Sequence, residues 1–313
     1  MQADLHLDTP SQLVLAGHPL DAGAPLEAGL PRLREGGTNL AVMVLWPGKA
    51  GVDHRARMFA LLDKMEAEIA RLDGVVLVRT PAEARAAAAA GRVGVVFALE
   101  GAHGLGADWR ADVSALHARG LAMLGLTWSM SNRFAGSSGD GGGGLTADGR
   151  ELVGEARRRG LLLDVSHASD ATAQAVCLGA AAPVVASHSD AHAVRAHDRN
   201  LRDALVRCIG ESGGVVGMNF HAPFVAAAAD ADAVARHAAH MASVAGPGVL
   251  ALGSDFDGWI RTPTDLSDAS ALPRLWVAMR RAGLSDAEVE AARGENFLRA
   301  WQAALDAAAP RGG

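Results

Sequence analysis

Eight short apolar segments alternate with longer stretches of helical patterning, and this alternation constrains the fold most. The segments are rich in Val, Leu and Ile without strict polar alternation, which is typical of parallel strands covered on both faces. We expect strands at residues 3–8, 40–46, 93–100, 121–128, 161–166, 183–187, 214–220 and 249–255. The pattern predicts an α/β protein, a (β/α)8 TIM-like barrel, rather than an open doubly wound sheet.

The intervening stretches predict the helices of the barrel. These are expected at 52–71, 107–119, 148–159, 170–179, 201–211 and 230–244, with an extra short strand at 75–78 and an Ala-rich helix at 81–90. Two paired helices over about 284–305, the first capped by Ser285, are expected to close the bottom of the barrel. We therefore predict a single barrel domain over 1–313, with these C-terminal helices packing on it.

Charge and cysteine usage exclude several classes of protein. The 29 Lys and Arg residues face 35 Asp and Glu residues, so no general attraction to nucleic acid or an anionic membrane is expected. Cys177 and Cys208 form no C-x-x-C pair, which argues against a disulfide framework and a thiolate zinc site. The opening MQADLHLDTP lacks the features of a signal peptide, and no apolar run approaches a membrane span. We expect a cytoplasmic protein.

Residues that can bind metal ions gather where the predicted strands end. In a parallel barrel, side chains just past the carboxyl ends of the strands face the active site. At these positions the sequence has His6, Asp8, Glu100, His167, His188 and Asp255. His6 and Asp8 are two apart, so they project to the same face of their strand. Imidazoles with carboxylates suit zinc, and manganese, iron or cobalt are alternatives.

These ligands are too many for one closed zinc site, which takes four. A bridging Glu100 accounts for the surplus, with His6 and Asp8 on one ion and His167 and His188 on the other. Two such ions can share a hydroxide and polarise a carbonyl, which is hydrolytic chemistry at an acyl carbon. Asp255 is then placed to transfer the proton to the leaving amine. Alternatively, Asp255 is a further ligand or an anchor behind the ligands.

The order and spacing of ten short segments make the chain recognisable. They are His6-Leu7-Asp8, 30–36 (LPRLREG), Glu100-Gly101, Leu126-Thr127, 164–167 (DVSH), Ser187-His188-Ser189, Arg199-Asn200-Leu201, 213–216 (GGVV), 253–258 (GSDFDG) and 294–299 (GENFLR). Through them the chain resembles, over nearly its whole length, the membrane-type (renal) dipeptidase family of zinc metallopeptidases. That family belongs to the wider group of amidohydrolase-like barrels.

The resemblance implies two zinc ions and a small dipeptide or dipeptide-like substrate. It assigns His6, Asp8 and Glu100 to one ion and Glu100, His167 and His188 to the other. It also implies that Asp255 transfers the proton and holds the substrate amine. Arg199 would grip the terminal carboxylate, for which a guanidinium is well suited. Tolerance of a D-residue at the C-terminal position is common in such enzymes, and homodimers are frequent, so the resemblance implies a second copy as a partner.

Two residues depart from the family pattern on the substrate side. Trp128 stands where the best-known dipeptidases have a histidine thought to stabilise the tetrahedral intermediate, which places the chain in a Leu-Thr-Trp subgroup. Losing such a donor costs roughly 3–4 kcal/mol of transition-state stabilisation, and Asn132 or the metal could replace it. His221 stands where tyrosine is common, and the chain has no tyrosine. His221 either donates a hydrogen bond to substrate or is a spare polar group.

The sequence therefore predicts a metal-dependent dipeptidase, with Trp128, Asn132, Arg199 and His221 contacting substrate. Two alternatives stay open at this point. Trp128 and His221 motivate a related amidohydrolase that acts on a non-peptide amide or a lactone. A non-catalytic binding protein on the same barrel is the other alternative, and the complete set of ligands argues against it.

Overall fold

A curled parallel sheet forms the centre of the computed structural model, which describes residues 1–309. Its strands are β1 (Ala3–Leu7), β2 (Leu40–Leu45), β4 (Val93–Leu99), β5 (Leu121–Gly125), β6 (Leu162–Asp164), β7 (Val184–Val185), β8 (Val216–Met218) and β9 (Leu250–Leu252). They follow one another in parallel from β1 to β7, and β8 pairs with β9. Single bridges, Ala186 with Val216 and Leu7 with Phe256, close the ring. The predicted TIM-like barrel is confirmed.

Several strands are shorter than predicted because the backbone turns before the site residues. Strand β9 ends at Leu252, whereas the predicted strand continued to residue 255. Asp255 has φ 66° and His167 has φ 63°. This left-handed region is incompatible with extended strand and uncommon for residues other than glycine. The site residues therefore lie in the turns that follow the strands, and the predicted ends at 255 and 166 were too long.

The predicted extra strand exists outside the ring. Strand β3 (Val75–Leu77) pairs with the first half of β4, with Val75 opposite Val93. Strand β5 pairs with the second half of β4, so the two strands share one edge of it. Helix α4 (Pro81–Ala89), capped by the Thr80 side chain, then leads into β4 as expected.

The six predicted barrel helices are confirmed. They are α3 (His54–Arg71), α5 (Trp109–Ala118), α6 (Ala147–Arg158), α7 (Asp170–Cys177), α8 (Asp203–Glu211) and α10 (Ala231–Ala245). The sequence interpretation missed α1 (Thr9–Leu15), α2 (Leu30–Glu35), α9 (Ala222–Val225) and α11 (Leu272–Arg281). Each of these four has a proline in its first turn, where the missing N–H costs no helical hydrogen bond. Short 3₁₀ turns are η1 (Ala102–Gly104), η2 (Pro247–Val249) and η3 (Ala269–Ala271).

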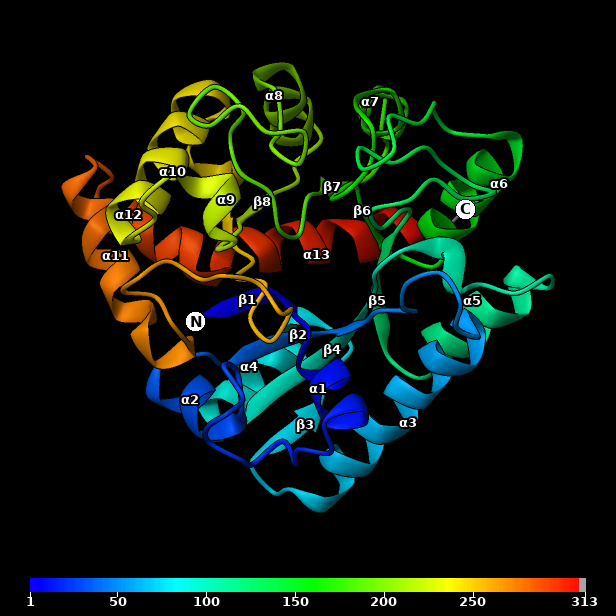
Figure 1. Cartoon of the computed structure of the whole chain (residues 1–313), viewed down its shortest axis with the longest axis horizontal. Helices are drawn as coiled ribbons and strands as arrows, with labels where there is room; N and C mark the ends of the chain where they lie inside the picture. The colour runs from blue at the N-terminus through cyan, green and yellow to red at the C-terminus, as the bar shows by residue number, and fades with distance from the viewer. Residues whose placement is uncertain (310–313) are drawn as a thin grey trace.

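The C-terminal helices form one continuous helical run rather than the predicted pair. Helix α12 (Asp286–Glu290) passes through a π-helical turn, η4 (Ala291–Glu295), into α13 (Asn296–Ala308). The Ser285 cap is confirmed, since Ser285 and Glu288 form a reciprocal capping box. In Figure 1, α13 (red) runs across the middle of the view beside the strands. Its Phe297 and Trp301 are buried in the same apolar cluster as strand residues of the barrel, so α13 closes the bottom.

Alternate residues of the strands face two apolar layers. In β2, Leu40, Val42 and Val44 belong to the apolar cluster that also contains residues of α13, whereas the intervening Ala41 and Met43 belong to the cluster formed with the outer helices. None of the helices within residues 1–309 is long and apolar enough to span a membrane.

Two glycines allow the backbone before His188 to pass close to β8 and β9. A Cβ atom on Gly217 would lie 1.9 Å from the carbonyl oxygen of Ser187, and one on Gly253 would lie 1.7 Å from it. Both distances are far inside van der Waals contact, so any side chain here would push the Ser187 segment away. The fold therefore positions this segment by close backbone packing.

We predict that Gly253→Ala lowers the free energy of unfolding by about 1–3 kcal/mol or more, because the added methyl overlaps the Ser187 carbonyl. Urea unfolding followed by circular dichroism measures the change. Gly23→Ala is the matched control, since a Cβ there meets nothing within 4 Å. Equal stability of the two variants would contradict the predicted close packing.

Candidate metal centre and active site

A cavity of about 550 Å³ opens at the carboxyl ends of the strands. That volume is in the range of pockets that enclose small molecules. The predicted site residues that line it are Asp8, Glu100, Trp128, His167, Arg199, His221 and Asp255. His6 and His188 lie deeper and are almost fully buried. The barrel therefore gathers side chains from distant segments into one place, as the strand-end rule predicts.

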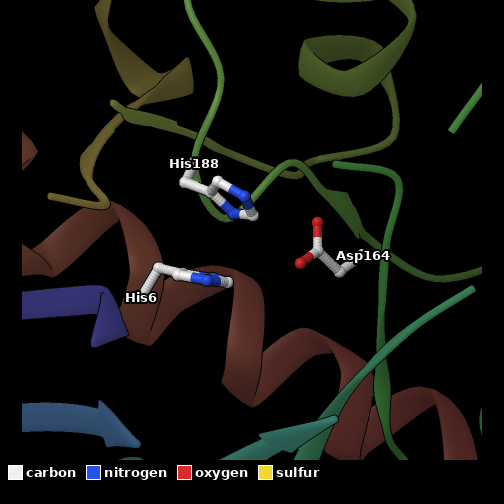
Figure 2. A group of neighbouring side chains, drawn as sticks. All are labelled: His6, Asp164 and His188. Carbon is white, nitrogen blue, oxygen red and sulfur yellow. The ribbon is translucent and has the colours of Figure 1, made fainter. Parts of the chain in front are cut away.

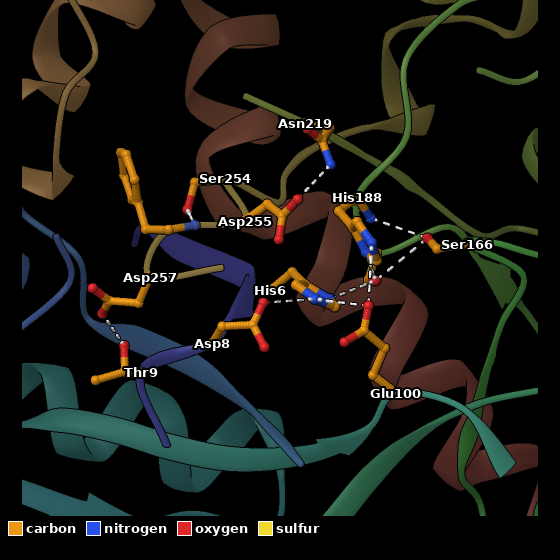
Figure 3. A network of polar contacts seen from close by, with 12 residues as sticks. His6, Asp8, Thr9, Glu100, Ser166, His188, Asn219, Ser254, Asp255 and Asp257 are labelled. Atoms are coloured by element: carbon orange, nitrogen blue, oxygen red, sulfur yellow. Dashed lines mark hydrogen bonds and ion pairs between the residues drawn. The ribbon is translucent and has the colours of Figure 1, made fainter. Parts of the chain in front are cut away.

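Three imidazoles converge on one carboxylate oxygen. The Oε1 atom of Glu100 lies 3.5 Å from Nε2 of His6, 3.0 Å from Nε2 of His167 and 3.6 Å from Nε2 of His188. Asp8 approaches from the other side, with its Oδ2 atom 3.7 Å from Nε2 of His6. Figure 3 shows His6, Asp8, Glu100 and His188 facing a common centre. Two groups that can hold a metal ion, His6–Asp8–Glu100 and Glu100–His167–His188, share Glu100.

Left-handed backbone conformations determine the directions of the His167 and Asp255 side chains. His167 and Asp255 both have positive φ angles, and such strain persists only where the surroundings enforce it. The carbonyl of His167 accepts the N–H of Ser138 at 2.9 Å, and the N–H of Asp255 donates to the carbonyl of His6 at 3.0 Å. Hydrogen bonds to neighbouring segments thus hold both residues at the rim of the barrel.

A third group, His6, Asp164 and His188 (Figure 2), is organised by one hydroxyl. The Oγ atom of Ser187 donates to Oδ2 of Asp164 at 2.5 Å. The same Oγ lies 3.1 Å from Nδ1 of His6 and 2.8 Å from Nδ1 of His188. A hydroxyl has one proton to donate, and Asp164 receives it. Both imidazoles must therefore donate their Nδ1–H to Ser187.

In the neutral imidazoles this proton arrangement leaves the lone pairs of both Nε2 atoms available to a metal ion, and Nε2 of His188 lies 2.9 Å from Nε2 of His167. A histidine ligand commonly donates its second ring N–H to a carboxylate or a carbonyl, which fixes its tautomer. Here one serine does so for two histidines, and Asp164 orients the serine. Asp164 also accepts the backbone N–H groups of Ser166 and Ser187, each at 2.9 Å. Asp164 therefore supports the cluster from behind.

The buried carboxylates of the site and their raised pKa values favour the binding of cations. Burial raises the pKa of Asp255 to about 7, and it raises the pKa of Glu100 well above its ordinary value. Burial lowers the pKa of His6, but Glu100 and Asp8 outweigh it and raise that pKa to about 10. Within residues 1–309, Nε2 of His6 is buried without a hydrogen-bond partner. Buried carboxylates around a free imidazole nitrogen fit divalent cations, whose binding releases the His6 proton.

Arg199, in the segment between β7 and α8, also lines the cavity. One Nη atom donates to the carbonyl of His188 at 3.1 Å, and the other donates to Oγ of Ser189 at 3.4 Å. Its Nε has no hydrogen-bond partner in the described part of the chain. The guanidinium is buried, oriented and still has donor capacity, which suits an anionic ligand.

The three further residues predicted to contact substrate have different surroundings. Trp128 and His221 both line the cavity. Nδ1 of His221 accepts the N–H of Arg261 at 3.4 Å, so the ring proton is on Nε2. Asn132 does not line the cavity, because its amide holds the loop after β5. Its Nδ2 donates to the carbonyl of Leu126, and its Oδ1 accepts the N–H of Phe134, both at 2.8 Å.

Sequence reasoning gave no role to several residues that the structure places at the site. Ser187 and Asp164 lie inside segments that carry the family resemblance, yet their function depends on contacts across the barrel. Trp46 follows β2 just as Glu100 follows β4, so the strand-end rule could have found it. Trp259 lies in the loop after β9, where no sequence pattern marks it.

Comparisons with known proteins agree with the fold and indicate a metal-dependent peptidase. The family model described as "Membrane dipeptidase (Peptidase family M19)" matches residues 1–311. The structure of a dipeptidase AC, a metallo peptidase of family M19, has a TM-score of 0.90 at 29% identity, covering 98% of this chain and 99% of that chain. A metallo peptidase from Rhodobacter sphaeroides, solved with a phosphinate mimic of the dipeptide L-Ala-D-Ala, has a TM-score of 0.90 at 28% identity, with 97% and 99% covered.

A relative from Klebsiella pneumoniae is also similar in sequence. It is described as an "Uncharacterized protein in pqqA 5'region" and is 36% identical over 225 residues, which are 66% of this chain and 82% of the relative. The barrel and its cluster of metal-binding groups define a metal-dependent hydrolase. The chain belongs to the membrane dipeptidase family, peptidase family M19, and is an enzyme of the metallodipeptidase class. The non-catalytic alternative is thereby excluded.

We predict that Ser187→Ala weakens retention of divalent metal by about 10- to 100-fold, because both imidazoles lose the acceptor that fixes their tautomer. Competition with a chelator, followed by metal analysis of the protein, measures the affinity. Ser243→Ala is the control, since that exposed hydroxyl on α10 bonds to the carbonyl of His240. Retention of metal equal to wild type would contradict the role given to Ser187.

Proposed function

We propose that the protein is a binuclear zinc dipeptidase. The observation that carries the proposal is the convergence of three imidazoles on Glu100, which belongs to both candidate metal groups. One ion would be held by His6, Asp8 and Glu100, and the other by Glu100, His167 and His188. Zinc suits this set of nitrogen and oxygen donors, although manganese, cobalt or iron can bind the same ligands.

Two bound divalent ions would supply a water of near-neutral pKa and polarise the scissile carbonyl. The protein then supplies orientation and proton transfer. One carboxylate oxygen of Asp255 accepts the Asn219 amide N–H at 3.1 Å. The other points toward the candidate ligands (Figure 3). In the proposed reaction this second oxygen holds the substrate ammonium and carries a proton to the leaving amine.

Arg199 positions the other end of the dipeptide. Its buried guanidinium binds the terminal carboxylate through charge-assisted hydrogen bonds. Nε2–H of His221 is a second donor on the same side of the cavity. Together with Asp255 these groups would bind both charged ends of a dipeptide, so we expect a longer peptide to bind poorly.

We also propose that a D-residue is accepted at the C-terminal position. The support is the similar structure from Rhodobacter sphaeroides, whose ligand mimics L-Ala-D-Ala. A second candidate function is hydrolysis of a non-peptide amide or lactone. Trp128 favours it, because a large, mostly apolar indole, whose single Nε1–H donor cannot take up or release a proton, stands in the cavity where the family pattern has an imidazole.

We predict that zinc-loaded protein releases amino acids from dipeptides and that Asp255→Asn lowers kcat by about 10²- to 10⁴-fold, because the amide cannot transfer the proton. A panel of L,L-, L,D- and D,L-dipeptides, with amino-acid release as the readout, measures activity and stereochemical preference. Metal content of the variant is measured in parallel as the control for an intact centre. No release by wild-type protein that holds two metal ions would instead favour the non-peptide substrate.

We predict that Arg199→Ala lowers kcat/KM by about 10- to 100-fold for a dipeptide with a free carboxylate, because charge-assisted hydrogen bonds are lost. The same dipeptide as its C-terminal amide should lose much less. Arg199→Lys keeps the charge without the planar fork, so its kcat/KM for the dipeptide with a free carboxylate should fall between the values of wild type and Arg199→Ala. Equal losses on acid and amide would show that Arg199 supports the fold rather than the substrate.

A further inference from the structure

Three tryptophans from distant segments form one wall of the cavity. Trp46 follows β2, Trp128 follows β5 and Trp259 lies in the loop after β9. The ring centroids of Trp46 and Trp128 are 5.2 Å apart, and those of Trp46 and Trp259 are 6.1 Å apart. These separations are typical of interacting aromatic rings. The three rings therefore form a continuous indole wall, a name we keep for Trp46, Trp128 and Trp259.

The outer part of this wall exposes apolar surface at the cavity mouth. Trp259 is 57% exposed, Leu15 is 51% exposed and Val52 is 41% exposed, and all three line the cavity. Large apolar side chains that gather at the mouth of a cavity mark a binding surface. Trp259 also has φ 54°, in the left-handed region that bulky residues rarely adopt. The protein thus holds an indole toward the cavity at a conformational cost.

Trp46, at the centre of the indole wall, lies across the barrel from Arg199. In the closed ring of eight strands, β2 is diametrically opposite β7, and Arg199 belongs to the segment that follows β7. Glu100 and the candidate metal ligands lie between them. A dipeptide whose carboxylate is bound by Arg199 therefore directs its N-terminal residue toward the indoles.

We propose that the indole wall binds a large apolar side chain, preferably aromatic, at the N-terminal position of the dipeptide. The inference rests on the proposed function and names its substrate class. The volume of about 550 Å³ is typical of pockets for drug-sized ligands, more than two small residues fill. An aromatic side chain covers the exposed indoles and leaves the reacting amide over Glu100.

Two cationic side chains lie beside the indole wall and would favour a different substrate, one with an acidic side chain. The guanidinium of Arg57 lies 5.4 Å from the ring centre of Trp46, and Lys49 also lines the cavity. An acidic side chain would be attracted to them. We expect the exposed apolar area to outweigh this attraction, because the Arg57 guanidinium is already engaged over the Trp46 face, although its buried Nε has no hydrogen-bond partner in the described part of the chain.

The experiment compares kcat/KM of zinc-loaded wild-type protein for Phe-Ala, its isomer Ala-Phe, Ala-Ala and Glu-Ala. Each C-terminal residue has the configuration that the enzyme prefers. We expect Phe-Ala to exceed both Ala-Phe and Ala-Ala by about 10- to 100-fold, the effect of burying one large apolar side chain. Trp259→Ala should lower the value for Phe-Ala at least ten times more than the value for Ala-Ala. Val277→Ala, an exposed apolar residue on α11 away from the cavity, is the control.

Each other outcome has a defined meaning. A preference for Ala-Ala, Ala-Phe or Glu-Ala over Phe-Ala overturns the inference and leaves the proposed dipeptidase function intact. Equal losses on Phe-Ala and Ala-Ala in Trp259→Ala also overturn it, since the indole would then act on structure alone. Hydrolysis of none of the four dipeptides overturns the proposed function itself, and the inference with it.

Discussion

Buried negative charge at the carboxyl ends of the strands is the constraint on which the rest of the site depends. Asp8 and Glu100 are buried and Asp255 is partly buried, and all three line the same cavity, where water cannot solvate them fully. Such an arrangement is stable only with cations, or with protons taken up in their place. Burial raises the pKa values of Glu100 and Asp255 for this reason. The imidazoles complete the set, since neutral nitrogen donors bind cations without adding charge.

The position of these donors depends on backbone packing some distance behind them. Gly217 and Gly253 let the Ser187 carbonyl approach β8 and β9. That approach sets the position of the Ser187 hydroxyl, which accepts hydrogen bonds from His6 and His188. A methyl group on either glycine would therefore disturb both the barrel and the tautomers of two candidate ligands. Stability and metal binding share the same few contacts here.

The sequence predicted those features that follow from local pattern. Strand periodicity and position located His6, Glu100 and Asp255 at the mouth of a barrel, because strand ends meet at one face. The role of Ser187 could not be predicted this way, since it contacts His6 across 181 residues of chain. The amide of Asn132 was predicted to face substrate, but nearby loop carbonyl and N–H groups engage it first. A sequence motif does not show which neighbouring backbone groups will form hydrogen bonds with a side chain such as the Asn132 amide.

The two departures from the family pattern act at opposite ends of the cavity. Trp128 packs beside Trp46 and extends an apolar wall, whereas His221 packs against Phe224, which also lies beneath the Arg199 guanidinium. One end of the cavity is thus mostly apolar, and the other has an imidazole beside a guanidinium. Because a dipeptide has a carboxylate at one terminus only, this unequal distribution of polarity distinguishes the two possible directions of the proposed substrate, and the proposed direction brings its carboxylate to Arg199.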